Sequence, residues 1–126
     1  MNIRLRRNIY VMNADGTQRV QVTVNTTVNS AASWSPDGTK IAFARVIDGN
    51  DEIYVMNADC SNQLRLTNNE FEDNWPRWSP DGSKIVFDSH RGLGTGKAQS
   101  NIFVINADGT GETNLTPNSF VNSMPD

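Results

Sequence analysis

A ten-residue segment occurs three times in this chain, and this internal repeat restricts the fold more than any other feature. The three copies span residues 8–17, 52–61 and 101–110, and each contains Ile-Tyr/Phe-Val-Met/Ile-Asn-Ala-Asp. A second pattern, Trp-Ser-Pro-Asp-Gly-Thr/Ser-Lys-Ile-x-Phe, occupies residues 34–43 and 78–87. Both patterns recur after 44 residues, and the last copy of the first pattern is displaced by five more. Two patterns that share one period indicate a repeated structural unit.

Each unit is predicted to contain four short strands. In the last unit, Ile85 and Phe87 alternate with their neighbours as a half-buried strand requires. The Pro-Asp-Gly and Ala-Asp-Gly segments are typical of turns. We therefore expect strands at residues 75–79, 84–88, 101–106 and 112–116, with Leu115 pointing inward. No segment shows a 3.6-residue period, so the sequence predicts an all-β protein.

Four-stranded units of about 40–50 residues are the size of β-propeller blades, whose two apolar faces both need neighbours. The Trp-Ser-Pro-Asp-Gly-x-Lys-Ile-x-Phe pattern, then Ile-Tyr-Val-Met-Asn-Ala-Asp-Gly, then Leu-Thr, resembles the WD40-like blade repeat of the TolB-like propeller family over residues 8–126. The resemblance implies blades of four antiparallel strands. In that family the repeat occurs in the periplasmic protein of the Tol–Pal envelope system, in propellers attached to serine peptidases, and in secreted proteins.

The strand order predicts about two and a half blades in a single region. The predicted parts are a half blade at residues 8–24, blades at residues 30–67 and 74–116, and the start of another blade at residues 122–126. Closed propellers typically have at least four blades. We therefore expect two or three copies to associate and complete a ring. The alternative is that the chain is a natural or engineered fragment of a larger propeller.

Composition excludes several function classes. The net charge of -3 and the pI of about 5.0 give no basic field for nucleic acid. No stretch of 18 apolar residues predicts membrane insertion, and the N-terminus lacks a signal-peptide pattern. The family resemblance implies a periplasmic or secreted protein, and the sequence leaves the compartment open. The chain has one histidine, one cysteine and no Gly-x-Ser-x-Gly elbow. We therefore expect no catalytic activity and no cofactor.

Candidate binding residues lie on the variable loops, because the turns are nearly identical between repeats. These loops, at residues 46–51, 68–74 and 88–100, are expected on one face of the blades. The partner-binding candidates on this face and at the channel mouth are Asn74, Trp75, Arg77, His90, Arg91 and Asp51. Core packing is the favoured role for Trp75, and contact with a partner is the alternative. Trp34 and Trp78 share a repeat position and are predicted to pack between blades.

Three further features have structural interpretations. Asp48, Asp51, Glu72 and Asp73 are secondary candidates for calcium, which binds carboxylates, but they do not follow the twelve-residue loop pattern, and no metal is predicted. Cys60 replaces the glycine of the other two repeats and is interpreted as a tolerated turn substitution. The glycines at 92–96 are interpreted as loop, because a phosphate loop must open a helix.

Three functions remain open. The first is a non-catalytic interaction scaffold that binds a protein or peptide, as the resemblance implies. The second is a propeller piece of a larger enzyme, of serine peptidase or lyase type, that binds or gates substrate. The third is a structural or engineered fragment without a ligand.

Overall fold

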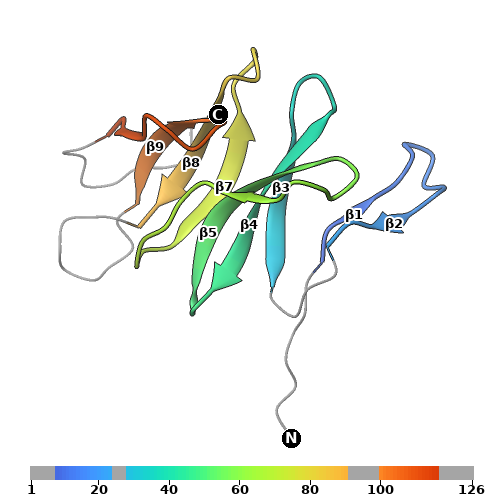
Figure 1. Cartoon of the computed structure of the whole chain (residues 1–126), viewed down its shortest axis with the longest axis horizontal. Coiled ribbons are helices and arrows are strands. Elements are labelled where there is room, and N and C mark those ends of the chain that lie inside the picture. The colour runs from blue at the N-terminus through green and yellow to red at the C-terminus, as the bar shows by residue number, and fades with distance from the viewer. Residues whose placement is uncertain (1–7, 24–27, 91–99, 117–126) are drawn as a thin grey trace, which may run out of the picture.

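The computed structural model describes residues 8–23, 28–90 and 100–116, and these residues form ten strands and no helix (Figure 1). All strand pairings are antiparallel, which confirms the predicted all-β class. The strands are β1 (Tyr10–Val11), β2 (Val20–Gln21), β3 (Asn29–Trp34), β4 (Lys40–Ile47), β5 (Asn50–Asn57), β6 (Leu64–Arg65), β7 (Asp73–Trp78), β8 (Lys84–Ser89), β9 (Asn101–Asn106) and β10 (Thr113–Asn114).

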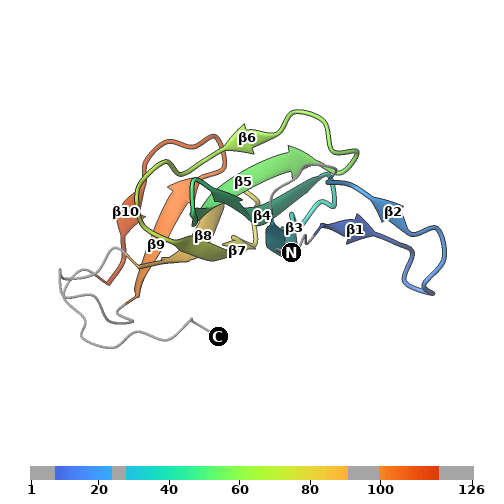
Figure 2. The same ribbon diagram turned by 90° about the horizontal axis from the view of Figure 1, so that it is seen from below.

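Two of the three sheets share one topology. Strands β3-β4-β5-β6 form a sheet that we call blade 1, and β7-β8-β9-β10 form blade 2. The remaining sheet pairs β1 only with β2, and we call it the half-blade. Figure 2 shows the sheets following one another in chain order, with the half-blade at one end and blade 2 at the other. The described part of the chain is therefore an open stack of propeller blades.

The predicted turns are present, and each is built around an aspartate. Asp81 Oδ1 accepts hydrogen bonds from Ser79 Oγ at 2.7 Å, from Ser83 N at 3.0 Å and from Ser83 Oγ at 2.8 Å. Equivalent serine and threonine donors surround Asp37. These bonds favour the ionised carboxylate, the serine hydroxyl most strongly, and lower the pKa of Asp37 and of Asp81 to about 2.

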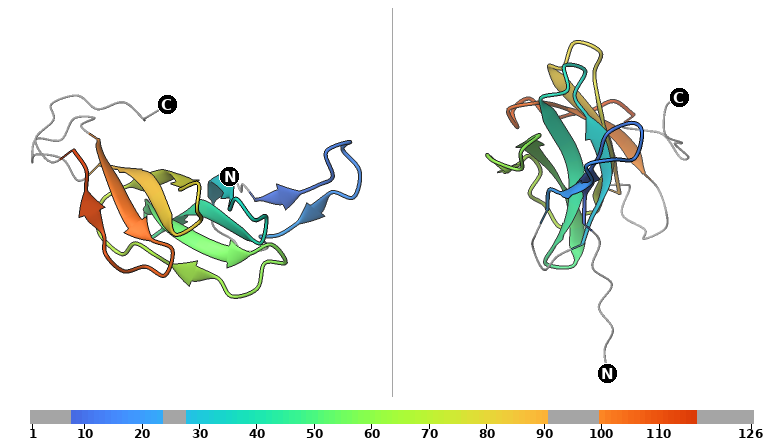
Figure 3. Two further views of the ribbon diagram at one scale, coloured as in Figure 1. Left: turned by 90° about the horizontal axis from the view of Figure 1, so that it is seen from above. Right: turned by 90° about the vertical axis from the view of Figure 1, so that its right-hand side faces the viewer.

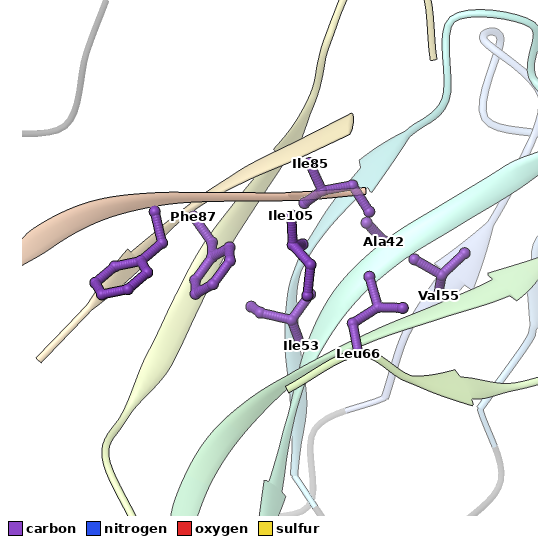
Figure 4. Packing of buried hydrophobic residues seen from close by; sticks show 8 residues of the cluster. Ala42, Ile53, Val55, Leu66, Ile85, Phe87 and Ile105 are labelled. Atoms are coloured by element: carbon purple, nitrogen blue, oxygen red, sulfur yellow. The ribbon is translucent and has the colours of Figure 1, made fainter. Parts of the chain in front are cut away.

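The main hydrophobic core lies between blade 1 and blade 2 (Figure 4). Ile85 and Phe87 of β8 are fully buried there, which confirms the inward face predicted for this strand. The Phe87 ring stacks on Phe103 with centroids 5.8 Å apart. The cluster consists of Ala42, Ile53, Val55, Leu66, Ile85, Phe87, Phe103 and Ile105, with Trp78 packed against it. The apolar side chains of this cluster are therefore buried by the packing of one blade against the other.

A second cluster, between the half-blade and blade 1, repeats the first. It contains Ile9, Val22, Ile41, Phe43, Tyr54 and Met56, with Val11 and Ile47 at its edge. Phe43 stacks on Tyr54 at 5.8 Å, as Phe87 stacks on Phe103. The half-blade thus docks on blade 1 as the outer half of blade 1 docks on blade 2.

The two repeated tryptophans differ in their surroundings. Trp78 packs against the main core, and its Nε1 donates a hydrogen bond to the Ser33 carbonyl of β3 at 3.0 Å. Trp34 is 48% exposed, so the prediction that both pack between blades is wrong for Trp34. The inner strand that Trp78 meets in blade 1 has no counterpart among the described residues of the half-blade.

The far face of blade 2 is also open within the described chain. Leu115, predicted to point inward, is 53% exposed, whereas its repeat counterpart Leu66 is 8% exposed. The prediction is wrong for Leu115 because blade 2 covers Leu66 and no described sheet covers Leu115. Open faces of this kind imply completion of the propeller by further blades.

Candidate functional site

The stack has two different ends along its strands (Figure 3). At one end the turns are linked by backbone hydrogen bonds from Ala58 N to Thr39 O and from Ala107 N to Ser83 O, both 2.9 Å. We call this end the turn face. The opposite end, which we call the loop face, carries the β4–β5 hairpin loop, the link at residues 66–72, the start of β7 and the end of β8. The sequence candidates were assigned to this second end.

Side chains on the loop face join blade 1 to blade 2. Asn74 Nδ2, at the start of β7, donates to Asp51 Oδ2 of β5 at 2.7 Å. Asn50 Nδ2 donates to the carbonyls of Asn69 at 3.1 Å and Phe71 at 2.9 Å. These hydrogen bonds hold the link between the blades in place, so the loop face has a defined arrangement of side chains.

Asp51 and His90 lie in one electrostatic neighbourhood. Burial of Asp51, together with the negative charges of Glu72 and Glu52, raises the pKa of its carboxyl, and His90 acts in the opposite direction. His90 Nδ1 lies 3.1 Å from Glu72 Oε2, and both side chains are about half exposed. The structure therefore brings two of the sequence candidates together around Glu72.

Trp75 is the most exposed apolar side chain of the loop-face candidates. It is 51% exposed, which makes the favoured core role wrong. The cause is the backbone: the register of β7 shifts between Asn74 and Arg77, and Trp75 has a φ of 56°. Ala31, its counterpart in blade 1, has a φ of 55°. The positive φ and the register shift therefore recur in both blades, and in blade 2 the residue at this position is a tryptophan.

Two more candidates flank Trp75. Asn74 Oδ1 accepts a hydrogen bond from the Trp75 backbone N at 2.8 Å, which stabilises the irregular backbone. Arg77 is exposed, and its Nη1 donates to the carbonyl of buried Pro76 at 3.1 Å. Arg91 lies outside the described residues, as do the insertion at 92–97 and residues 122–126. Asn74, Trp75 and Arg77 thus all lie on β7, where the register shifts.

The structure also holds a buried charged group that sequence reasoning missed. Glu52 is fully buried, and its Oε1 lies 3.2 Å from Arg65 Nη2 and accepts a bond from Asn69 N at 3.0 Å. Thr67 Oγ1 donates to its other oxygen. The repeat contained a signal for this residue, because a charged Glu52 stands where the first copy has the neutral Asn8.

The secondary calcium candidates do not form a ligand set. Asp48 is exposed in the β4–β5 turn, Asp73 is fully buried, and Glu72 points to His90. Within residues 8–23, 28–90 and 100–116, no three His, Cys, Asp or Glu side chains come together as metal ligands.

A family comparison accounts for the repeat. The model of the TolB β-propeller domain matches residues 4–126, almost the whole chain. The chain belongs to the TolB β-propeller family. No curated protein sequence gives a significant match.

Solved TolB structures agree with this assignment. A protein assigned as TolB from Agrobacterium tumefaciens is 27% identical, with a TM-score of 0.75 over 86% of this chain. TolB from Acinetobacter baumannii is 28% identical, with a TM-score of 0.73 over 92% of this chain. The chain spans only 40% and 28% of these two proteins. The TolB-like chain therefore corresponds to part of such a propeller.

Propellers of enzymes share the fold at lower identity. An oligogalacturonate lyase in complex with manganese is 18% identical, with a TM-score of 0.62 over 86% of this chain and 29% of its own length. This likeness shows the blade architecture alone. In the described part of the TolB-like chain, no helix is long and apolar enough to span a membrane.

Proposed function

We propose that this TolB-like chain is a non-catalytic interaction scaffold whose loop face binds a protein or an extended peptide around Trp75. The exposed indole of Trp75 carries the proposal, because it is 51% exposed at a point where the register of β7 shifts and the backbone has a positive φ. Large aromatic side chains with arginine nearby dominate the binding energy of protein interfaces. Arg77 provides such an arginine, and the Asn74–Asp51 bond holds the adjoining backbone in place.

Binding can be tested with a displayed library of random peptides selected on the purified protein. We expect Trp75→Ala to weaken the selected peptides at least about tenfold, the loss typical of an interface anchor. The urea midpoint of the variant should stay close to that of the parent, because the side chain is half exposed.

Trp34→Ala is the matched control, because Trp34 is 48% exposed at the end of the edge strand β3, next to the Ser35–Lys40 turn and not at the loop-face site. This variant should leave peptide affinity unchanged. Selected peptides that bind Trp75→Ala as tightly as the parent would contradict the proposal.

The proposal includes association of copies, which would bring more blades onto the open faces. Tyr10 and Met12 of the half-blade, 44% and 60% exposed, occupy the repeat positions of Phe103 and Ile105. In another copy they would face Leu115, as Phe103 and Ile105 face Leu66 in the main core. Light scattering should give a mass above one chain, and a monomer at all concentrations would contradict this part.

A further inference from the structure

A cavity of about 380 Å³ lies between blade 1 and blade 2, near the turn face. It is beside β6, the strand at the outer edge of blade 1 (Figure 2). All of its lining residues come from blades 1 and 2, so it does not depend on the open faces of the stack. Its size is within the usual range for small-ligand sites. The lining residues are Lys40, Val55, Asn62, Gln63, Leu64 and Ala107.

Hydrogen bonds hold both walls of the cavity in place. On the blade 1 side, Val55 of β5 pairs with Leu64 of β6. Gln63 Oε1 accepts a hydrogen bond at 2.8 Å from Nη2 of Arg45, which is itself buried. On the blade 2 side, the backbone N of Ala107 donates one of the turn-face hydrogen bonds. The cavity is therefore preformed, which reduces the cost of ordering it around a ligand.

The lining combines apolar side chains with one ammonium group. Val55 is buried, and its strand partner Leu64 is 46% exposed. Lys40 Nζ donates to the neutral Asn57 Oδ1 at 2.8 Å. Within residues 8–23, 28–90 and 100–116, Lys40 has no ion pair with a carboxylate. The cavity therefore suits a ligand with an apolar group and a negative charge.

The equivalent lysine of blade 2 is balanced by an acid. The pKa of Asp108 is lowered first by a hydroxyl hydrogen bond of its own turn, and the charge of Lys84 lowers it further. In blade 1 the pKa of Asp59, the counterpart of Asp108, is lowered by hydrogen bonds of its own turn, without a contribution from Lys40. The charge of Lys40 thus remains available to a ligand.

Asn62 adds a second polar group to the lining. Its φ is 52°, and its counterpart in blade 2 is Gly111, with a φ of 68°. The position requires a left-handed backbone in both blades, which glycine adopts most readily. In blade 1 it carries a carboxamide that has no hydrogen-bond partner in the described part of the chain. The N–H groups of this carboxamide can donate to an oxygen of a ligand.

We propose that this cavity binds a carboxylate attached to a short branched apolar group, from either the C-terminal residue of a peptide or a free aliphatic acid. The carboxylate pairs with Lys40 Nζ and accepts a hydrogen bond from Asn62. The apolar group packs against Val55, Leu64 and Ala107. The cavity volume equals about a dozen waters at roughly 30 Å³ each, so the ligand has about a dozen non-hydrogen atoms. With one exposed lysine, its dissociation constant should be about 1 mM.

The probe is N-acetyl-leucine, which has this chemistry and this size, titrated into the ¹⁵N-labelled protein. We expect saturable shifts of the backbone amides of Leu64 and Ala107. N-acetyl-leucinamide, which lacks the negative charge, should bind at least about threefold more weakly. N-acetyl-glycyl-leucine and 4-methylpentanoate distinguish the two sources, because the tighter of the two shows whether peptide ends or free acids fit better.

Matched variants complete the test. Lys40→Gln should weaken N-acetyl-leucine about three- to fivefold, the effect of losing an exposed ion pair. Lys84→Gln is the control, because Lys84 Nζ makes the equivalent bond to Asn106 Oδ1 at 2.6 Å away from the cavity. Asn62→Gly introduces the glycine of blade 2 and should weaken binding without unfolding the protein.

Four results would overturn the proposal. They are equal effects of Lys40→Gln and Lys84→Gln, equal affinity for N-acetyl-leucine and its amide, shifts that gather around Trp75 instead of the cavity, and no saturable shift up to about 20 mM ligand.

Discussion

Cys60 has a backbone conformation that suits glycine. Its φ is 68°, and its counterparts in the other repeats are Gly16 and Gly109, with φ values of 86° and 90°. A side chain in this left-handed region meets the following carbonyl, which costs about 1–2 kcal/mol. The turn nevertheless closes as in the other repeats, through a hydrogen bond from Cys60 N to Asn57 O at 2.9 Å. The substitution is tolerated and strained.

We predict that Cys60→Gly stabilises the protein by about 0.5–1 kcal/mol, since relief of strain exceeds the added freedom of the unfolded chain. The urea midpoint measures the change. Cys60→Ala is the control, because it removes the thiol and keeps the strain. Equal gains from both variants would assign the effect to the thiol.

At the residue scale, the sequence predicted which loops lie on the loop face but not which side chains are exposed there. The loops that vary between repeats were predicted to lie on one face, and on this face Asn74 donates a hydrogen bond to Asp51. The role of this face in binding stays a prediction. The exposure of Trp75 was not predicted. A strand pattern assigns sides by alternation, and the register shift after Asn74 breaks that alternation without a marker such as glycine.

At the scale of elements, a threonine joins strands three and four of every unit. The hydroxyls of Thr23, Thr67 and Thr116 accept hydrogen bonds from the backbone N of Ile9, Ile53 and Ile102 at 2.8–2.9 Å. In the half-blade the hydroxyl of Thr23 also donates to Asn8. In blade 1 the corresponding acceptor is buried Glu52, and Arg65 neutralises it. The same threonine hydrogen bond thus ends on a neutral amide in the half-blade and on the charged Glu52, paired with Arg65, in blade 1.

We predict strong coupling between Glu52 and Arg65. Arg65→Gln should cost about 2–3 kcal/mol, below the range for fully buried pairs because the Arg65 side chain is 32% exposed. Glu52→Asn removes the buried charge and should cost less. The double variant carries the residues that occupy these repeat positions in the half-blade, Asn8 and Gln21, and should be at least about 1 kcal/mol more stable than the sum of the single changes predicts. Additive urea unfolding energies would contradict this.

A second prediction compares one repeat position in two blades. Leu66→Ala should cost about 2–4 kcal/mol, because Leu66 is buried between blades. Leu115→Ala should cost less than about 1 kcal/mol, because Leu115 is 53% exposed. Both are measured by urea unfolding at low protein concentration. A large loss at Leu115 would show that its face is covered in solution.

The same comparison explains how far the sequence determines these elements. Strand positions and turns follow from local alternation and from Pro-Asp-Gly signals, so the sheets were predictable. Trp34 and Trp78 have the same local pattern, yet only Trp78 has an inner strand beside it. Burial at a blade surface depends on the neighbouring sheet, and a local pattern contains no information about that neighbour.

At the scale of the whole molecule, the aspartate turns are expected to contribute to the response to acid. Besides Asp37 and Asp81, the pKa values of Asp15, Asp59 and Asp108 are lowered, in each case first by a hydroxyl hydrogen bond. A lowered folded-state pKa stabilises the fold above the unfolded value and ceases to do so as pH falls through the folded value. Asp51 has a raised pKa, so its effect has the opposite sign.

We therefore predict that the free energy of unfolding falls as pH drops from about 4, the unfolded aspartate value, to about 2, the folded value for Asp37 and Asp81. Asp37→Asn with Asp81→Asn should make this decline shallower. Asp51→Asn should leave the decline in place. Urea unfolding at a series of pH values measures all three proteins, and an unchanged slope in the double variant would contradict the assignment.

The backbone hydrogen bonds between adjacent turns at the turn face bear on how much extra sequence the connection between β8 and β9 can hold. The bonds from Ala58 to Thr39 and from Ala107 to Ser83 close each blade at the turn face. The connection between β8 and β9 is longer than that between β4 and β5, yet Ser89 still faces Asn101 as Arg45 faces Glu52. Strand register is therefore independent of what joins the strands at the opposite end. Foreign sequences of different lengths could be grafted between β8 and β9 without altering how the blades stack.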